Sequence, residues 1–252
     1  MGRAGRCSRP TWPRSTSSTS GGGRPACTSC PSWGSGPTCG SSTSAPGSAG
    51  RRATSPESSG AEVTGIDLTP EHCEVATMLA AELGLGDRAR FIEASATDLP
   101  FEAERFDAAY MMHVGMNVAD KAAMYREIHR VLRPGAVFGI YDIMVGAAGG
   151  PLAFPVPWAT VAETSFLVDA DEACALCAEA GFVVEDREDR TEASLAFFYR
   201  LAAQAADGPV GLPPLGLHLL MGPDFEVKVR NMVANIQQGR CGPWELVCRK
   251  PA

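Results

Sequence analysis

Acidic and polar residues end the apolar segments of residues 60–144. The first segment, GAEVTGIDLTP, predicts a strand over residues 63–67 that carries Asp67 at its carboxyl end. In a nucleotide-binding α/β sheet, ligands bind where the strands end, and an acidic residue at the end of the second strand bonds ribose hydroxyls. Asp67 is therefore a candidate ribose ligand, and the alternative is that it only caps the helix that follows.

The same stretch alternates predicted strands with predicted helices. The strands cover residues 63–67, 90–94, 106–112 and 136–142. One helix starts at Pro70 after Thr69 and stops at Gly84, with Val75, Met78, Leu79 and Leu83 on one face. Another follows Asp120, with Met124, Ile128, Val131 and Leu132 facing the sheet, and Pro134-Gly135 turns the chain into the next strand. This alternation implies an α/β fold with parallel pairing and right-handed crossovers.

The rest of the chain predicts further elements above the binding edge. Residues 145–157 are rich in Gly, Pro and Ala and indicate a loop. Helices are predicted over residues 171–180, 192–206 and 224–237, and strands over residues 182–185 and 244–249. Residues 145–240 are therefore expected to supply the lid and the substrate-binding elements.

Residues 1–56 differ in composition from the rest of the chain. They contain no Leu, Ile, Val, Phe, Tyr, Asp, Glu or Lys. A first strand and a Gly-rich turn are expected about 20 residues before Asp67. Residues 41–56, SSTSAPGSAGRRATSP, cannot form the buried centre of a parallel sheet. We expect a disordered or mistranslated leader over residues 1–56 and the domain over residues 57–252.

A shift of the reading frame accounts for this leader. With each codon moved by one base, residues 41–56 can be back-translated without conflict to Val-Leu-Asp-Val-Gly-Ser-Gly-Leu-Gly-Gly-Pro-Ala-Arg-Tyr-Leu-Ala. That string predicts an apolar strand, an acid, a Gly-rich turn and a helix start, with its first two glycines at positions 45 and 47. The alternative is a natural, disordered leader rich in Ser, Pro and Gly.

Charge and cysteine content argue against several classes of function. All 29 acidic residues lie from Glu57 onward, while seven Arg precede it, so the predicted domain is acidic and unsuited to holding nucleic acid by its phosphates. No apolar run reaches the roughly 18 residues of a membrane span. The domain's five scattered cysteines, including the helical pair Cys174 and Cys177, predict reduced core thiols and a cytoplasmic location, with no metal site.

Four motifs resemble, in their order and spacing, the class I methyltransferases that use S-adenosylmethionine. They are VTGIDLT, SATDLPF, RFDAAYMMHV and REIHRVLRPGAVFGIYD. The similarity is to the small-molecule branch with ubiquinone-type and sarcosine/dimethylglycine-type enzymes. It implies an α/β, Rossmann-like, doubly wound and mostly parallel seven-stranded sheet, with the first strand and the Gly-rich loop corrupted in this chain. It also implies S-adenosylmethionine as cofactor and a small molecule as methyl acceptor.

The resemblance assigns the cofactor to residues at the strand ends. These are Asp67 for the ribose hydroxyls, Leu68 packed on the adenine, Ser95 and Ala96 at the adenine edge, Asp98 near the adenine amine, and Met112 beside the methionine part. Asp98 has the alternative role of capping the turn at Leu99. Family members usually carry Asp or Asn in place of Ser95, so a weaker bond is expected. The family's glycine loop matches no residue of this chain.

The expected chemistry needs little beyond alignment. A sulfonium methyl is already activated, so the enzyme mainly aligns the acceptor and excludes water. His113 is the candidate base for the acceptor's proton, and the alternative is a packed histidine. Tyr141 and Asp142 are expected to orient the acceptor. Trp158 and His218 are candidate pocket residues, and the alternative for His218 is a loop histidine without a role. The aromatic residues of the lid suit either an apolar acceptor or a cationic amine.

Two other classes of function compete with methyl transfer. A non-catalytic relative of the methyltransferases would keep the fold without the reaction. A nicotinamide-dependent oxidoreductase would use the same half-sheet, but its short-chain kind needs a Tyr-x-x-x-Lys pair, and none of the four Tyr has Lys four residues later. The identity of the acceptor and the oligomeric state are left open by the sequence.

Overall fold

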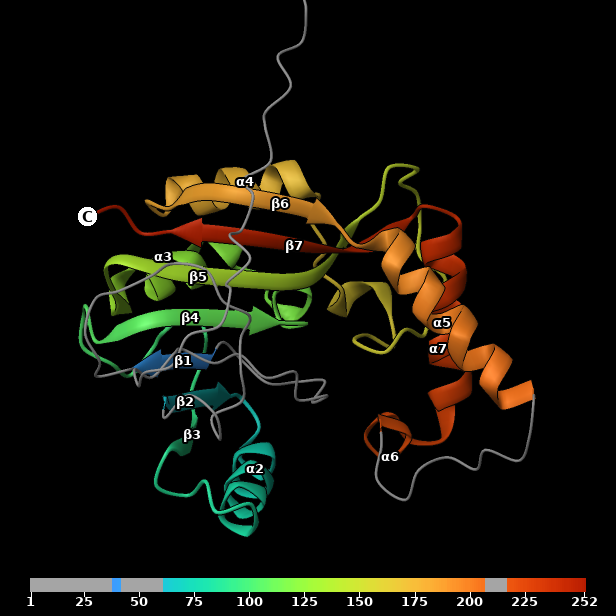
Figure 1. The fold of residues 1–252 in the computed structure, drawn as a ribbon. Coiled ribbons are helices and arrows are strands. Elements are labelled where there is room, and N and C mark those ends of the chain that lie inside the picture. Colours follow the sequence, from blue (N-terminus) through green and yellow to red (C-terminus); the bar gives the residue numbers. More distant parts are fainter. Residues whose placement is uncertain (1–37, 42–60, 207–216) are drawn as a thin grey trace, which may run out of the picture.

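A seven-stranded sheet forms the centre of the described part of the chain. The computed structural model describes residues 38–41, 61–206 and 217–252 (Figure 1). The strand order is β3-β2-β1-β4-β5-β7-β6. The strands are β1 (Thr38–Ser41), β2 (Glu62–Asp67), β3 (Ala89–Glu93), β4 (Phe106–Met112), β5 (Leu132–Val145), β6 (Val183–Asp189) and β7 (Cys241–Arg249). The predicted doubly wound α/β architecture is confirmed.

Most strands run in one direction. The pairs β2–β3 and β4–β5 are parallel, and β6 runs the same way because both β5 and β6 pair antiparallel with β7. β1 runs against its neighbours β2 and β4, with Thr38 opposite Gly65 and Ser41 opposite Glu62. The central position of the sheet is therefore occupied by the short strand β1, which runs in the reversed direction. β1 ends at the edge of the sheet opposite the edge that carries Asp67.

The hydrophobic core lies under helix α3 (Lys121–Val131). The side chain of Asp120 accepts a hydrogen bond of 2.8 Å from the Ala123 N–H, as expected of a helix cap. The predicted apolar face is confirmed, since its four residues are fully buried: Met124, Ile128, Val131 and Leu132. They pack with residues of the sheet such as Phe106, Phe138 and Leu246. Helix α4 (Ala170–Glu179) covers the same core and buries Cys177.

Helix α2 (Pro70–Glu82) turns its apolar stripe outward. The predicted face of Val75, Met78, Leu79 and Leu83 is at least 50% exposed at every position. The face against β2 and β3 instead buries the small residues Cys73 and Ala80. The 3.6-residue period thus predicted the helix, but the apolar stripe faces away from the sheet.

Several boundaries differ from those predicted. β5 begins at Leu132 rather than Ala136, because Pro134-Gly135 forms an irregularity within the strand instead of a separate turn. Gly135 has φ +81°, which favours glycine. The edge strand β6 extends to Asp189, and its outward charges protect the free edge from pairing with another chain.

Lid elements lie beyond the carboxyl ends of the parallel strands. Figure 1 shows helices α5 (Thr191–Ala206), α6 (Leu217–Met221) and α7 (Phe225–Gln237) beside this edge. A second apolar cluster joins Met232 and Ile236 of α7 to Ile143, Val156 and Trp158. The predicted boundary between residues 56 and 57 lies outside the described residues. None of the helices in the described ranges is long and apolar enough to cross a membrane.

Candidate active site

The carboxylate of Asp67 lies at the end of β2 and is 8% exposed. Its Oδ1 accepts a hydrogen bond of 2.9 Å from the Thr69 N–H and lies 3.5 Å from Nδ1 of His72. Oδ2 takes up no hydrogen bond among the described residues. The side chain therefore caps the turn with one oxygen, as the alternative interpretation expected, and the ribose interpretation stays a prediction.

The end of β3 lies next to Asp67. The Ala94 N–H donates to the Asp67 carbonyl at 2.9 Å, which brings Ser95 and Ala96 to the same edge of the sheet. The Ser95 hydroxyl pairs with the Thr97 hydroxyl at 2.8 Å. Leu68 is 70% exposed at this edge, in keeping with a side chain that packs on a ligand.

Asp98 is exposed, and it does not cap the turn that follows. The Leu99 N–H donates to Oε2 of Glu127 at 2.9 Å, so a residue distant in sequence performs that role. The alternative role of Asp98 as a cap is therefore wrong. A hydrogen bond to Glu127 raises the pKa of Arg130, and the exposed carboxylate of Asp98 helps to raise it.

Met112 and His113 follow at the end of β4. The backbone of His113 has φ +55°, in the left-handed region, and its N–H donates to the Tyr141 carbonyl at 2.8 Å. The two rings meet edge to face with centroids 5.2 Å apart. Burial lowers the pKa of His113 to about 4. The imidazole is neutral at physiological pH, which leaves it a weak base.

Asp142 lies in a different place from that expected of an acceptor ligand. Its carboxylate is buried and accepts hydrogen bonds from the N–H groups of Met116 (3.0 Å) and Ile143 (2.9 Å). Neighbouring residues of a strand point to opposite faces of the sheet. The half-buried Tyr141 lies on the face where its ring contacts His113, and Asp142 therefore lies on the other face. Burial raises the pKa of Asp142 to about 7.

Lys121 is a site residue that the sequence interpretation missed. It occupies the first position of α3 and is 6% exposed. A positive charge at the start of a helix opposes the helix dipole. A lysine at that position, directly after the capping Asp120, was the local signal that the side chain has another role.

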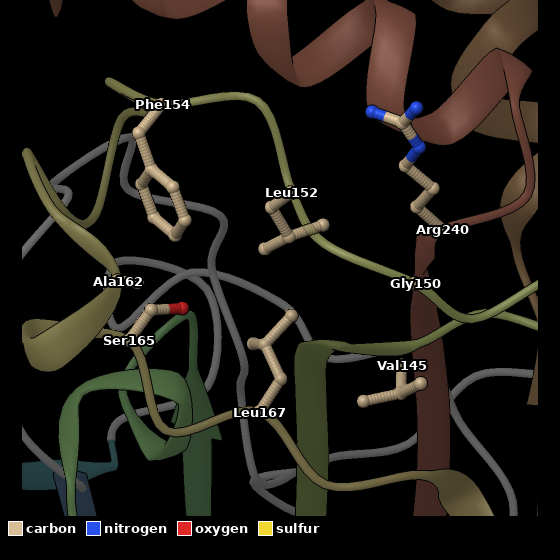
Figure 2. Close-up of a pocket in the computed structure, with 8 residues that line it drawn as sticks. All are labelled: Val145, Gly150, Leu152, Phe154, Ala162, Ser165, Leu167 and Arg240. Atoms are coloured by element: carbon tan, nitrogen blue, oxygen red, sulfur yellow. The ribbon is translucent and has the colours of Figure 1, made fainter.

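A small apolar pocket lies within the lid. It has a volume of about 200 Å³ and its lining is Val145, Gly150, Leu152, Phe154, Ala162, Ser165, Leu167 and Arg240. Figure 2 shows Leu152 and Leu167 approaching from opposite sides, while the Arg240 guanidinium points away from Leu167. Because Val145 lies four residues beyond Tyr141 on β5, the pocket is about 13 Å farther along the strand direction.

The two predicted pocket residues of the lid lie outside this lining. Trp158 is buried behind it and donates from Nε1 to the Ser165 hydroxyl at 2.9 Å. His218 lies on α6 beside Phe225, with ring centroids 6.0 Å apart. α6 packs on α7. Trp158 thus contacts the lining through Ser165, while His218 takes no part in this lining and stays a prediction for the acceptor site.

Two further chemical features concern cysteine and metal binding. The described part of the chain holds five free cysteines and no group of three His, Cys, Asp or Glu that could bind a metal. The free thiols of Cys177 and Cys248 form a hydrogen bond in the core, and this bond together with burial raises the pKa of Cys177. Such thiols are packed and unreactive.

Comparison with known proteins gives a family match for part of the chain. Residues 45–140 match the family described as "Methyltransferase domain". The matched residues make up less than half of the chain. The match includes the strand ends that carry Asp67, Ser95 and Met112, and it extends into the Ser/Pro/Gly-rich segment before Glu57. S-adenosylmethionine is the cofactor of this family.

The curated relatives are much longer than the region they share with this chain. The erythromycin 3''-O-methyltransferase of Saccharopolyspora erythraea is 38% identical over 84 residues, which are 33% of this chain and 28% of that protein. The chain therefore spans about a quarter of the length of the curated relatives it matches.

Solved methyltransferase-like structures share the fold over a longer stretch. The [4+2]-cyclase SpnF has a TM-score of 0.57 and 26% identity, with 75% of this chain and 66% of that chain covered. The geranyl diphosphate C-methyltransferase of Streptomyces coelicolor A3(2), solved with S-adenosyl-L-homocysteine, has a TM-score of 0.57 and 16% identity, with 74% and 62% covered.

Proposed function

We propose that the chain transfers a methyl group from S-adenosylmethionine to a small-molecule acceptor. One observation carries the proposal: Asp67 and Ser95 lie side by side at neighbouring strand ends, at the edge where Met112 and His113 end β4. Ligands of open α/β sheets bind at this edge. The bound cofactor would supply an activated methyl group.

The residues present fit the adenosine half of the cofactor. Oδ2 of Asp67 can accept a ribose hydroxyl, Leu68 can pack on the adenine, and Ser95 and Ala96 border it. Within the described ranges, β1 brings no Gly-rich turn to the methionine half, because β1 runs in reverse and Ser41 ends at the opposite edge. The positions of the predicted glycines, 45 and 47, lie outside the described residues.

The pocket supports an extended, apolar acceptor rather than a cationic amine. Its lining holds one aromatic ring, that of Phe154, and no carboxylate, so it offers neither an aromatic cage nor an anion to a cation. The pocket lies about 13 Å beyond Tyr141 along the direction of β5. The acceptor must therefore be long enough to fill the pocket and still reach Met112. Relatives named for erythromycin, sterols and geranyl diphosphate support this class.

Methyl transfer from radiolabelled S-adenosylmethionine tests the reaction and the acceptor class. We expect labelled product with long apolar alcohols such as farnesol, and none with sarcosine or dimethylglycine. The matched variant Leu167→Trp fills the pocket, whereas Val161→Trp changes an exposed side chain of the same lid. Transfer to the amines, or equal transfer by both variants, would contradict the proposed acceptor.

Asp67→Ala is expected to weaken binding of S-adenosylhomocysteine by roughly 10- to 100-fold, because a hydrogen bond to a charged group contributes about 1.5–3 kcal/mol. Isothermal titration calorimetry measures the dissociation constant. Glu71→Ala, which removes an exposed carboxylate one turn away on α2, is the control and should leave it unchanged. Equal affinity of Asp67→Ala and the parent would refute the assignment of the ribose site.

A second candidate is a relative with this fold that does not transfer methyl groups. The reversed β1 favours it, and the similarity to SpnF, titled a [4+2]-cyclase, provides a precedent on the same fold. Binding of S-adenosylhomocysteine without turnover of any acceptor would favour this candidate over methyl transfer.

We further propose a cytoplasmic protein that acts on a small molecule and does not bind nucleic acid. The five free cysteines of the described ranges support a reducing compartment. The excess of acidic over basic residues, 29 against 22, supports a partner other than nucleic acid.

A further inference from the structure

The ammonium group of Lys121 is fully engaged by backbone carbonyls. Nζ donates hydrogen bonds to the carbonyls of Gly115 (2.7 Å), Val118 (2.8 Å) and Phe166. An ammonium has three donors, and these three acceptors satisfy all of them. Two of the carbonyls belong to the segment after β4 and the third to the lid, so one side chain joins two regions that are far apart in sequence.

Asp142 holds the same segment from the sheet. Its carboxylate accepts from the Met116 N–H, and the Gly115 N–H adds a further hydrogen bond. The approach is close, because a Cβ placed on Gly115 would lie 2.5 Å from Oδ2 of Asp142. The segment of residues 113–118 is therefore held both by the buried carboxyl group of Asp142 and by the buried ammonium group of Lys121.

Two more hydrogen bonds connect this segment to the lid. The Phe166 N–H donates to the Met116 carbonyl at 2.9 Å, and the Asn117 amide donates to the Trp158 carbonyl at 2.7 Å. Phe166 thus binds the segment through its N–H and binds Lys121 of α3 through its carbonyl, and Lys121 is the only side chain that reaches this carbonyl among the bonds described.

We propose that Lys121 is a positioning residue that holds the lid in register with the end of β4. The proposal rests on the proposed function, since the end of β4 carries Met112 and His113 and the lid carries the acceptor pocket. Through Gly115 and Phe166, Lys121 fixes the distance between the methyl-donating edge and the acceptor.

Hydrogen–deuterium exchange of the full chain tests the proposal with Lys121→Met. We expect exchange on the order of tenfold faster in peptides that cover residues 113–118 and 160–168, and unchanged exchange in β6 and β7. Lys250→Met is the matched control, because Lys250 is also largely buried and donates to two carbonyls, of His129 and Leu132, at the other end of the sheet. If Lys121→Met does not fold, Lys121→Gln replaces it and should show the same pattern to a smaller degree.

A spectroscopic measurement distinguishes positioning from general stability. The indole N–H of Trp158 donates to Ser165 within the lid, and its NMR signal can be assigned with Trp158→Phe. We expect this signal to shift or broaden in Lys121→Met and to stay unchanged in Lys250→Met. Equal effects of the two variants, or no local change in either, would overturn the proposal. Neither measurement needs a cofactor, so failure to bind S-adenosylhomocysteine would count against the function and not against the role of Lys121.

Discussion

Replacing residues 41–56 by Val-Leu-Asp-Val-Gly-Ser-Gly-Leu-Gly-Gly-Pro-Ala-Arg-Tyr-Leu-Ala is expected to raise the affinity for S-adenosylhomocysteine at least 100-fold, about 2.8 kcal/mol. In the present chain β1 is four residues long, contains only small or polar side chains and runs against its neighbours. The replacement offers an apolar strand that can pair parallel with β2 and β4, followed by a Gly-rich turn at the edge of Asp67.

The gain has two physical sources. A parallel first strand would bury apolar side chains at the centre of the sheet, and glycines allow the backbone N–H groups to approach a ligand closely. Calorimetry of both chains measures the difference. A control with Ala at positions 45 and 47 of the replaced segment keeps the strand but removes the turn, and should recover little of the affinity. Tight binding by the present chain, with no gain on replacement, would disprove the frame hypothesis.

Asp142→Asn is expected to change how the free energy of unfolding depends on pH. Burial raises the pKa of Asp142 from 3.8 to about 7, so the native state keeps its proton over a range in which the unfolded chain releases it. Stability contributed by this group is present below pH 3.8 and is lost as the pH rises to about 7. The loss amounts to about 4 kcal/mol. Lys121 on α3 is the charged group that opposes the shift.

His113 has the opposite dependence. Burial lowers its pKa from 6.5 to about 4, so its contribution is present above pH 6.5 and is lost as the pH falls towards 4. The two effects oppose each other between about pH 4 and pH 6.5 in the parent chain. Asp142→Asn should therefore reveal a loss of stability towards acid, and His113→Asn a loss towards neutral pH.

Urea denaturation at several pH values between 4.5 and 7.5 measures these slopes. Asn is chosen at position 113 because it tolerates the positive φ of +55°. The readout is the slope with pH, since at every pH His113→Asn also removes the ring contact with Tyr141 and Asp142→Asn alters the hydrogen bonds with Met116 and Ile143. Parallel profiles for the parent and both variants would show that neither group titrates as proposed.

Local sequence patterns determined most of the architecture. Strand–helix alternation predicted β2 to β5 and α3, and the buried face of α3 is formed by the residues that the 3.6-residue period selects. The position of Asp67 after an apolar strand was sufficient to predict a ligand site, because a strand end is a local feature. The composition of residues 1–56 likewise indicated that the expected first strand is missing.

The tertiary structure alone decided which partners these residues meet. Asp142 and Tyr141 are neighbours in sequence, yet one is buried under the loop after β4 and the other stays beside His113, because the sheet separates its two faces. The outward stripe of α2, the reversed direction of β1 and the contact of Lys121 with Phe166 also depend on packing between distant segments. A sequence period specifies the spacing of side chains along one element, whereas the surroundings of each side chain are set by elements that the period does not describe.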